Sequence, residues 1–114
     1  MKAPLHAPWS DTVDLIVFVA TKDAEGYETL TETPHTVFCN WSDGVSQKEF
    51  YLSDKAGMRA SAQVEIHKID MQDAWPRGTP GERFVDFNGR RYRVLRDFPQ
   101  SFDTQTLILA EVIL

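Results

Sequence analysis

The stretch FVDFNGRRYRVLR, residues 84–96, decides the fold that we expect for this chain. Asn88-Gly89 lies between two short runs of aromatic and β-branched residues, and both residues tolerate the positive φ of a two-residue type I′ turn. The turn predicts four cross-strand pairs: Phe87–Arg90, Asp86–Arg91, Val85–Tyr92 and Phe84–Arg93. The face suited to burial then carries Val85, Tyr92 and Val94. The opposite face carries Phe84, Asp86, Arg91 and Arg93.

The rest of the chain adds further strands. Residues 12–20 and the C-terminal stretch from residue 104 are apolar on both faces, which is typical of strands in a central position or at a subunit boundary. Residues 27–41 form a returning strand, in which Pro34 favours an edge, a bulge or a bend. Residues 62–70 alternate cleanly between apolar and polar. The chain is therefore expected to be mainly β, a small antiparallel barrel or sandwich of about six strands, and we favour the barrel.

Three segments do not follow the strand pattern. Residues 1–11 are expected to form a flexible arm ahead of a single domain, residues 12–114, with Trp9 folding back onto the domain or docking on a partner. Residues 46–58 begin with a capping box and predict one short helix inside a long connection. Residues 71–82 carry prolines and glycines without any period and predict a long loop.

Composition limits the classes of function. The chain has 114 residues, of which 42% are hydrophobic and 25% charged, as in ordinary soluble domains. A formal net charge of −5 weighs against a general nucleic-acid binder, which needs excess Lys and Arg. The single cysteine, Cys39, is expected to be a small buried hydrophobe. No signal peptide or membrane span is apparent, so we expect a soluble protein made in the cytoplasm.

No motif indicates catalysis or a cofactor. The three histidines, His6, His35 and His67, lack the spacing of a metal site, and GTPG at residues 78–81 lacks the Lys-Ser/Thr that completes a phosphate loop. The chain is therefore predicted not to be an enzyme and to bind no metal or cofactor.

Four arginines follow the Asn-Gly turn: Arg90, Arg91, Arg93 and Arg96. With Tyr92 and Phe84 they could form a stacking face for single-stranded nucleic acid. Strand alternation divides them, however, placing Arg91 and Arg93 on one face and Arg90 and Arg96 on the other. We interpret these arginines, together with Trp9 and Trp75, as candidate contacts to other subunits or to a connector.

The order of motifs resembles a known family. A hairpin is followed by S-x-K-E-F-Y at residues 46–51, A-G-M-R-A at residues 56–60, V-E-I-H at residues 64–67, F-N-G-R-R-Y-R-V at residues 87–94 and an apolar final strand. This order, over most of residues 12–112, is similar to the head-closure, or head–tail joining, proteins of long-tailed bacteriophages and prophages.

The resemblance implies a structural virion protein that is assembled in the bacterial host. It implies a small β-barrel that forms a ring of its own copies under the portal and adaptor, closes the filled head, joins it to the tail proteins, and lets double-stranded DNA pass without sequence recognition. It also implies that a loop at about residues 43–61 projects into the channel, with candidate gating residues Glu49, Phe50, Tyr51, Lys55 and Arg59. The insert at residues 71–82 is an alternative channel loop.

Two other functions stay open at the sequence level. One is a small barrel that binds single-stranded nucleic acid through Phe84, Tyr92 and the arginines. The other is a related tail-completion protein that docks from the tail side.

Overall fold

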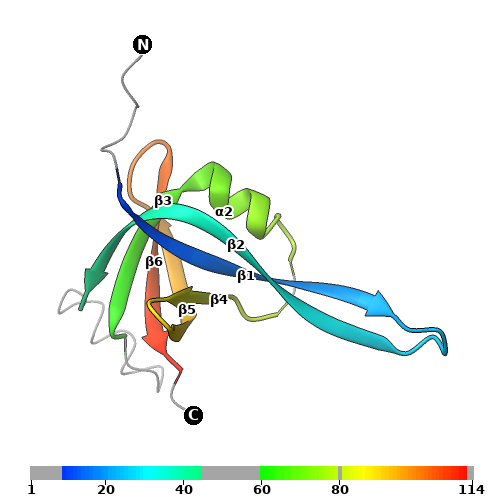
Figure 1. Cartoon of the computed structure of the whole chain (residues 1–114). Helices are drawn as coiled ribbons and strands as arrows, with labels where there is room; N and C mark the ends of the chain where they lie inside the picture. Colours follow the sequence, from blue (N-terminus) through cyan, green and yellow to red (C-terminus); the bar gives the residue numbers. More distant parts are fainter. Residues whose placement is uncertain (1–8, 45–59, 80, 113–114) are drawn as a thin grey trace.

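The computed structural model describes residues 9–44, 60–79 and 81–112. Six strands form a closed barrel with the order β1-β2-β3-β6-β5-β4, in which all neighbouring strands are antiparallel (Figure 1). The strands are β1 (Asp11–Lys22), β2 (Glu28–Asp43), β3 (Ala62–His67), β4 (Phe84–Phe87), β5 (Arg90–Pro99) and β6 (Thr104–Glu111), and a short helix α2 (Lys68–Ala74) follows β3. The mainly β fold and the antiparallel barrel predicted from the sequence are confirmed. The helix predicted at residues 46–58 lies outside the described residues.

The β4–β5 hairpin has the predicted register. Phe84 pairs with Arg93, Val85 with Tyr92, Asp86 with Arg91 and Phe87 with Arg90. Asn88 has a φ of 53° and Gly89 a φ of 80°, the two positive values that a type I′ turn requires. Because a slip of one residue would exchange the two faces, this turn decides which side chains of β4 and β5 enter the barrel.

The core fills the barrel with the inward-facing residues of its strands. Leu15, Val64, Ile66, Val85, Leu107 and Leu109 are completely buried. Strand β6 lies between β3 and β5, and six consecutive residues from Thr104 to Leu109 are buried. Side chains on both faces of β6 are therefore covered over this stretch.

The chain turns into a helix earlier than the sequence pattern indicates. The strand predicted at residues 62–70 ends at His67, and α2 occupies the start of the predicted loop at residues 71–82. Backbone N–H of Lys68 donates to the carbonyl of Asp103, which anchors the start of the helix beside the β5–β6 connection. The helix then directs Ala74 and Trp75 into the core cluster. A helix of seven residues is too short for its period to stand out beside a strand.

A bulge between Val94 and Arg96 changes the face on which Arg96 lies. Val94 pairs with the inward-facing Leu109, whereas Arg96 pairs with Ile108 and Asp97 with the inward-facing Leu107. Leu95 is thus the extra residue of the bulge. Arg96 consequently shares the outer face with Arg91 and Arg93, and the strict alternation that grouped it with Arg90 is wrong at this point.

Candidate functional site

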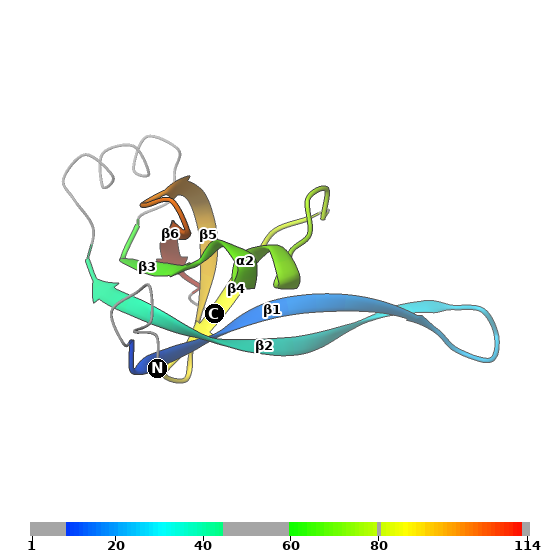
Figure 2. The same cartoon turned by 90° about the horizontal axis from the view of Figure 1, so that it is seen from above.

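The hairpin formed by β1 and β2 is much longer than the barrel. The two strands pair continuously from Asp11–Cys39 to Lys22–Glu28, but every residue from 18 to 34 is exposed. Figures 1 and 2 show this end of the hairpin projecting away from the barrel in both views. We call residues 18–34 the ribbon. Its length leaves it without support from the barrel over most of its course.

Local interactions give the ribbon its own order. At the tip, a carboxylate oxygen of Asp23 accepts hydrogen bonds from the backbone N–H groups of Glu25 (3.0 Å) and Tyr27 (2.8 Å). Gly26, with a φ of 87°, supplies the left-handed residue of the turn. Farther along, the hydroxyls of Thr21 and Thr29 lie 3.1 Å apart across the strands. These contacts set the turn and favour extended backbone.

One arginine connects the base of the ribbon to the barrel. The guanidinium of Arg91 on β5 donates to both carboxylate oxygens of Glu32 at 2.6 and 2.8 Å and to both oxygens of Asp86 at 2.8 and 3.1 Å. The hydrogen bond from Arg91 lowers the pKa of the Glu32 carboxyl, and both carboxylates raise the pKa of Arg91. The ribbon's direction is therefore fixed by a forked ion pair as well as by the sheet.

The ribbon exposes large apolar side chains. The exposed fraction is 40% for Phe18, 44% for Val19, 68% for Leu30 and 71% for Tyr27. A two-stranded ribbon is marginally stable alone, and exposed apolar side chains on it do not stabilise the isolated subunit by burial. Exposed apolar surface gathered on one projecting element is typical of a protein-docking surface.

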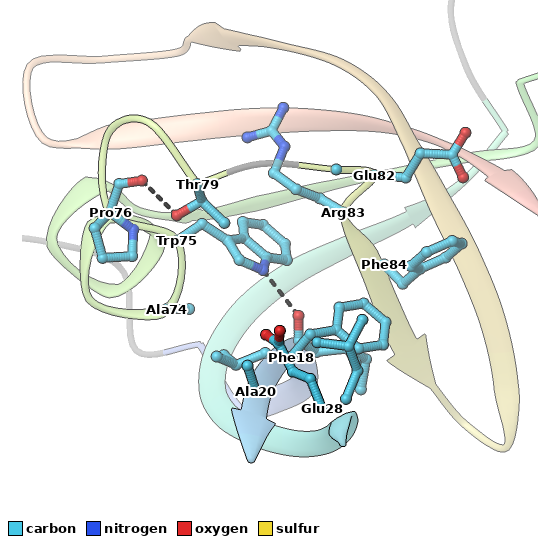
Figure 3. Close-up of a pocket in the computed structure, with 14 residues that line it drawn as sticks. Phe18, Ala20, Glu28, Ala74, Trp75, Pro76, Thr79, Glu82, Arg83 and Phe84 are labelled. Atoms are coloured by element: carbon cyan, nitrogen blue, oxygen red, sulfur yellow. Dashed lines mark hydrogen bonds between the residues drawn. The ribbon is translucent and has the colours of Figure 1, made fainter. Parts of the chain in front are cut away.

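An apolar groove lies where the ribbon leaves the barrel (Figure 3). It has a volume of about 620 Å³, and the ribbon and the segment between α2 and β4 form its two sides. Its lining includes Ile16, Phe18, Leu30, Trp75 and Phe84. Trp75 is 6% exposed, and its indole N–H donates to the carbonyl of Ile16 at 2.9 Å, so the ring is held as one wall of the groove.

The turn on the far side of the groove is also well defined. Backbone N–H of Thr79 donates to the carbonyl of Pro76 at 2.9 Å, and the hydroxyl of Thr79 donates to the same oxygen. Arg83 forms an ion pair with Asp97 and places its guanidinium 5.4 Å from the centre of the Trp75 ring. The exposed Arg77 lies in this turn and has no carboxylate partner among residues 9–44, 60–79 and 81–112.

The residues singled out in the sequence do not form one site. The candidate gating residues, Glu49, Phe50, Tyr51, Lys55 and Arg59, lie outside the described residues. Trp9 stacks on His67 with ring centres 4.4 Å apart, so it folds back onto its own domain. Trp75 belongs to the groove, at the other end of the short helix.

The candidate contact arginines on β5 mostly lie beside carboxylates. Besides Arg91, Arg90 lies 3.7 Å from Glu111 and Arg93 lies 3.3 Å from Glu82, while Arg96 lies over the ring of Phe98 at 5.2 Å. Tyr92 is only 6% exposed and belongs to the core, as the predicted face division requires. These residues do not present the row of open aromatic rings that base stacking needs.

No family model matches the chain, and a search among curated proteins returns no relative. The part of the chain that the structure describes contains no group of three or more His, Cys, Asp or Glu side chains placed to hold a metal ion. None of the helices described is both long and apolar enough to cross a membrane.

The sequence did not predict that the paired strands extend beyond the barrel as a ribbon. The strands were expected at residues 12–20 and 27–41, and nothing in their alternation marks where the barrel ends. One signal was present: the segment TLTETPHT at residues 29–36 alternates threonines with larger residues but has few apolar ones. Such a strand cannot contribute much to a core, although its partner strand is strongly apolar.

Proposed function

We propose that the protein is a non-enzymatic structural joiner of phage heads and tails, which assembles as a ring under the portal and adaptor and closes the DNA-filled head. The observation that carries the proposal is the ribbon, a projecting hairpin with exposed Phe18, Tyr27 and Leu30. Such an element is typical of an assembly subunit, because neighbouring proteins cover its apolar side chains once the assembly forms. The motif order described above supports the same function.

The charge of the chain fits a channel through which DNA must move. The formal net charge is −5, and three of the four candidate arginines on β5 lie within 4 Å of a carboxylate. A strongly basic lumen would hold the phosphates through released counterions, whereas a neutral or acidic one lets them slide. Residues 43–61 are the proposed channel loop on the strength of the resemblance, with residues 71–82 as the alternative.

Nucleic-acid binding on the β4–β5 face is the less supported alternative. It needs Tyr92 and Phe84 as stacking rings beside free arginines. Tyr92 is buried, and Arg91 makes four hydrogen bonds to two carboxylates. Salt-sensitive binding of an oligonucleotide that disappears in Arg91→Ala/Arg93→Ala would nevertheless favour this alternative.

The proposal is tested on phage heads that are filled with DNA but lack tails, prepared from the phage or prophage whose genes flank this one. Added protein is expected to bind these heads, restore retention of their DNA and permit tail attachment. Protein that neither binds nor restores either property would overturn the proposal. Cross-linking then decides the side of docking, because products with the portal or adaptor indicate the head side and products with the tail tube indicate tail completion.

A further inference from the structure

The ribbon tip offers an exposed aromatic ring and acidic side chains, and the groove offers an apolar interior with Arg77 in the turn beside it. The tip, residues 22–28, carries three carboxylates (Asp23, Glu25 and Glu28) against one lysine. Its aromatic residue, Tyr27, is 71% exposed. Most residues that line the groove are apolar; its charged lining residues are Glu28, Glu82 and Arg83, and Arg77 lies in the turn beside it. A tyrosine side chain offers roughly 150–250 Å² of surface for burial, and tyrosines are frequent anchors of protein interfaces.

The tip extends away from the barrel of its own chain (Figure 2), which places it where a neighbouring molecule can be reached. We propose that the ribbon tip of one copy docks in the groove of a second copy, with Tyr27 entering the groove and the acidic residues of the tip facing Arg77. This inference rests on the self-assembly that is part of the proposed function. It goes further by naming the two surfaces that meet.

A contact of this kind is heterologous, since it joins two different surfaces. Heterologous contacts repeat from copy to copy and close into a ring when the rotation permits. A symmetric contact between two tips is disfavoured because it would bring the same carboxylates of both copies together. It would also leave both apolar grooves open.

Side chains, rather than added strands, are expected to make the contact. Within the part of the chain that the structure describes, residues 28–38 of β2 pair with β1 and no second strand lies along their other edge. Pro34 lies in the middle of this edge and lacks the N–H that strand addition uses. The groove, in contrast, is lined by a fixed Trp75 and by Phe84, which offer a surface for an inserted ring.

The first test follows backbone amide signals by NMR as the protein is concentrated from the micromolar to the millimolar range. Signals of the tip and signals of the groove are expected to shift together. Tyr27→Ala and Arg77→Glu should each weaken self-association, Tyr27→Ala by about tenfold or more. Thr31→Ala, in the ribbon but outside both the tip and the groove lining, is the matched control and should leave self-association unchanged. Concentration-independent spectra, or shifts that persist in Tyr27→Ala, would overturn the inference.

The second test is disulfide cross-linking between two single variants. Tyr27→Cys copies mixed with Thr79→Cys copies should form a disulfide-linked dimer under mild oxidation, and Thr79 is chosen because it lines the groove. The native Cys39 is 1% exposed and should not compete. Neither variant alone should give as much dimer. Equal or greater dimer from Tyr27→Cys alone would indicate a tip-to-tip contact and contradict the inference.

The two proposals fail in different ways. If wild-type protein shows the tip–groove contact but does not act on DNA-filled heads, the interface is correct and the phage function is wrong. If it restores the heads while Tyr27→Ala does so equally well, the phage function stands and the interface is wrong.

Discussion

Arg91 on β5 holds Glu32 on β2 through two hydrogen bonds, although 59 residues separate them in the sequence. The two strands are not neighbours in the sheet, since β4 and β1 lie between them. The ion pair therefore spans the outer face of the barrel at the base of the ribbon. Phe18 and Phe84 pack edge to face beside it, with ring centres 6.2 Å apart. Together these contacts keep the ribbon in one direction, which a repeating interface requires.

Replacement of Arg91 by methionine should loosen the ribbon more than the barrel. The variant keeps a side chain of similar length but leaves Glu32 and Asp86 without their shared partner. Amide hydrogen exchange in residues 28–34 should accelerate, whereas exchange at the core residues Leu15 and Val85 should change little. Arg90→Met is the matched control, because Arg90 is more exposed and lies 3.7 Å from Glu111. Equal effects of the two substitutions would show that Arg91 has no special role.

The same contact should be sensitive to acid. The Arg91 guanidinium holds the pKa of the Glu32 carboxyl below its ordinary value of 4.5. A carboxyl whose pKa is lower in the folded than in the unfolded state stabilises the folded contact at any pH above the unfolded-state pKa. That stabilisation is lost as the pH falls through the folded-state pKa. The protection factors of amides in the ribbon, which correct for the pH dependence of intrinsic exchange, should therefore fall below about pH 4.5 in the wild type. In Arg91→Met the ribbon should lack this acid-induced step. An identical step in both proteins would assign it to other carboxylates.

Two leucines in the same hairpin should differ sharply in their effect on stability. Leu15 is completely buried, whereas Leu30 is 68% exposed. Leu15→Ala removes core contacts and should lower the free energy of unfolding by about 2–5 kcal/mol. Leu30→Ala should change it by no more than about 0.5 kcal/mol, since the side chain contributes little in the isolated subunit. Chemical denaturation of both variants measures this difference. A large loss for Leu30→Ala would mean that the ribbon is part of the folded core.

The buried Cys39 should be inert and should make the protein less stable in alkali. Burial, with a smaller effect from the charge of Asp11, raises the pKa of its thiol from 9.0 to about 12. The folded state then retains a proton that the unfolded state loses, so stability should fall as the pH rises from about 9 to about 12. The difference in unfolding free energy between wild type and Cys39→Ala should shrink over that range. A thiol reagent should react quickly only after denaturant is added, and fast reaction with native protein would contradict the burial.

The sequence was most informative where structure depends on neighbours along the chain. Asn88-Gly89 determines its turn by backbone preference alone, so the pairs from Phe84–Arg93 to Phe87–Arg90 were predictable. The face of Arg96 was not, because the bulge at Leu95 arises where β5 meets β6. Non-local pairing decides such features.

The ribbon and the groove could not be predicted from the sequence for the same reason. The β1–β4 pairing covers only residues 14–16 of β1, and this short contact decides where the barrel ends and the ribbon begins. Trp75 could be recognised as a notable aromatic residue, but its hydrogen bond to Ile16 joins positions 59 residues apart. Apolar alternation in β1 is the same on both sides of that boundary, so it predicts a strand without predicting what covers it.

Amide hydrogen exchange of the ribbon, measured in the free protein and in protein incorporated into DNA-filled heads, tests most directly whether the ribbon is an assembly surface. In the head particles, residues 18–34 should gain strong protection, while Val13, Leu15 and Ile16, already buried in the barrel, should change little. A ribbon that exchanges equally fast in the free and the incorporated protein would contradict the account.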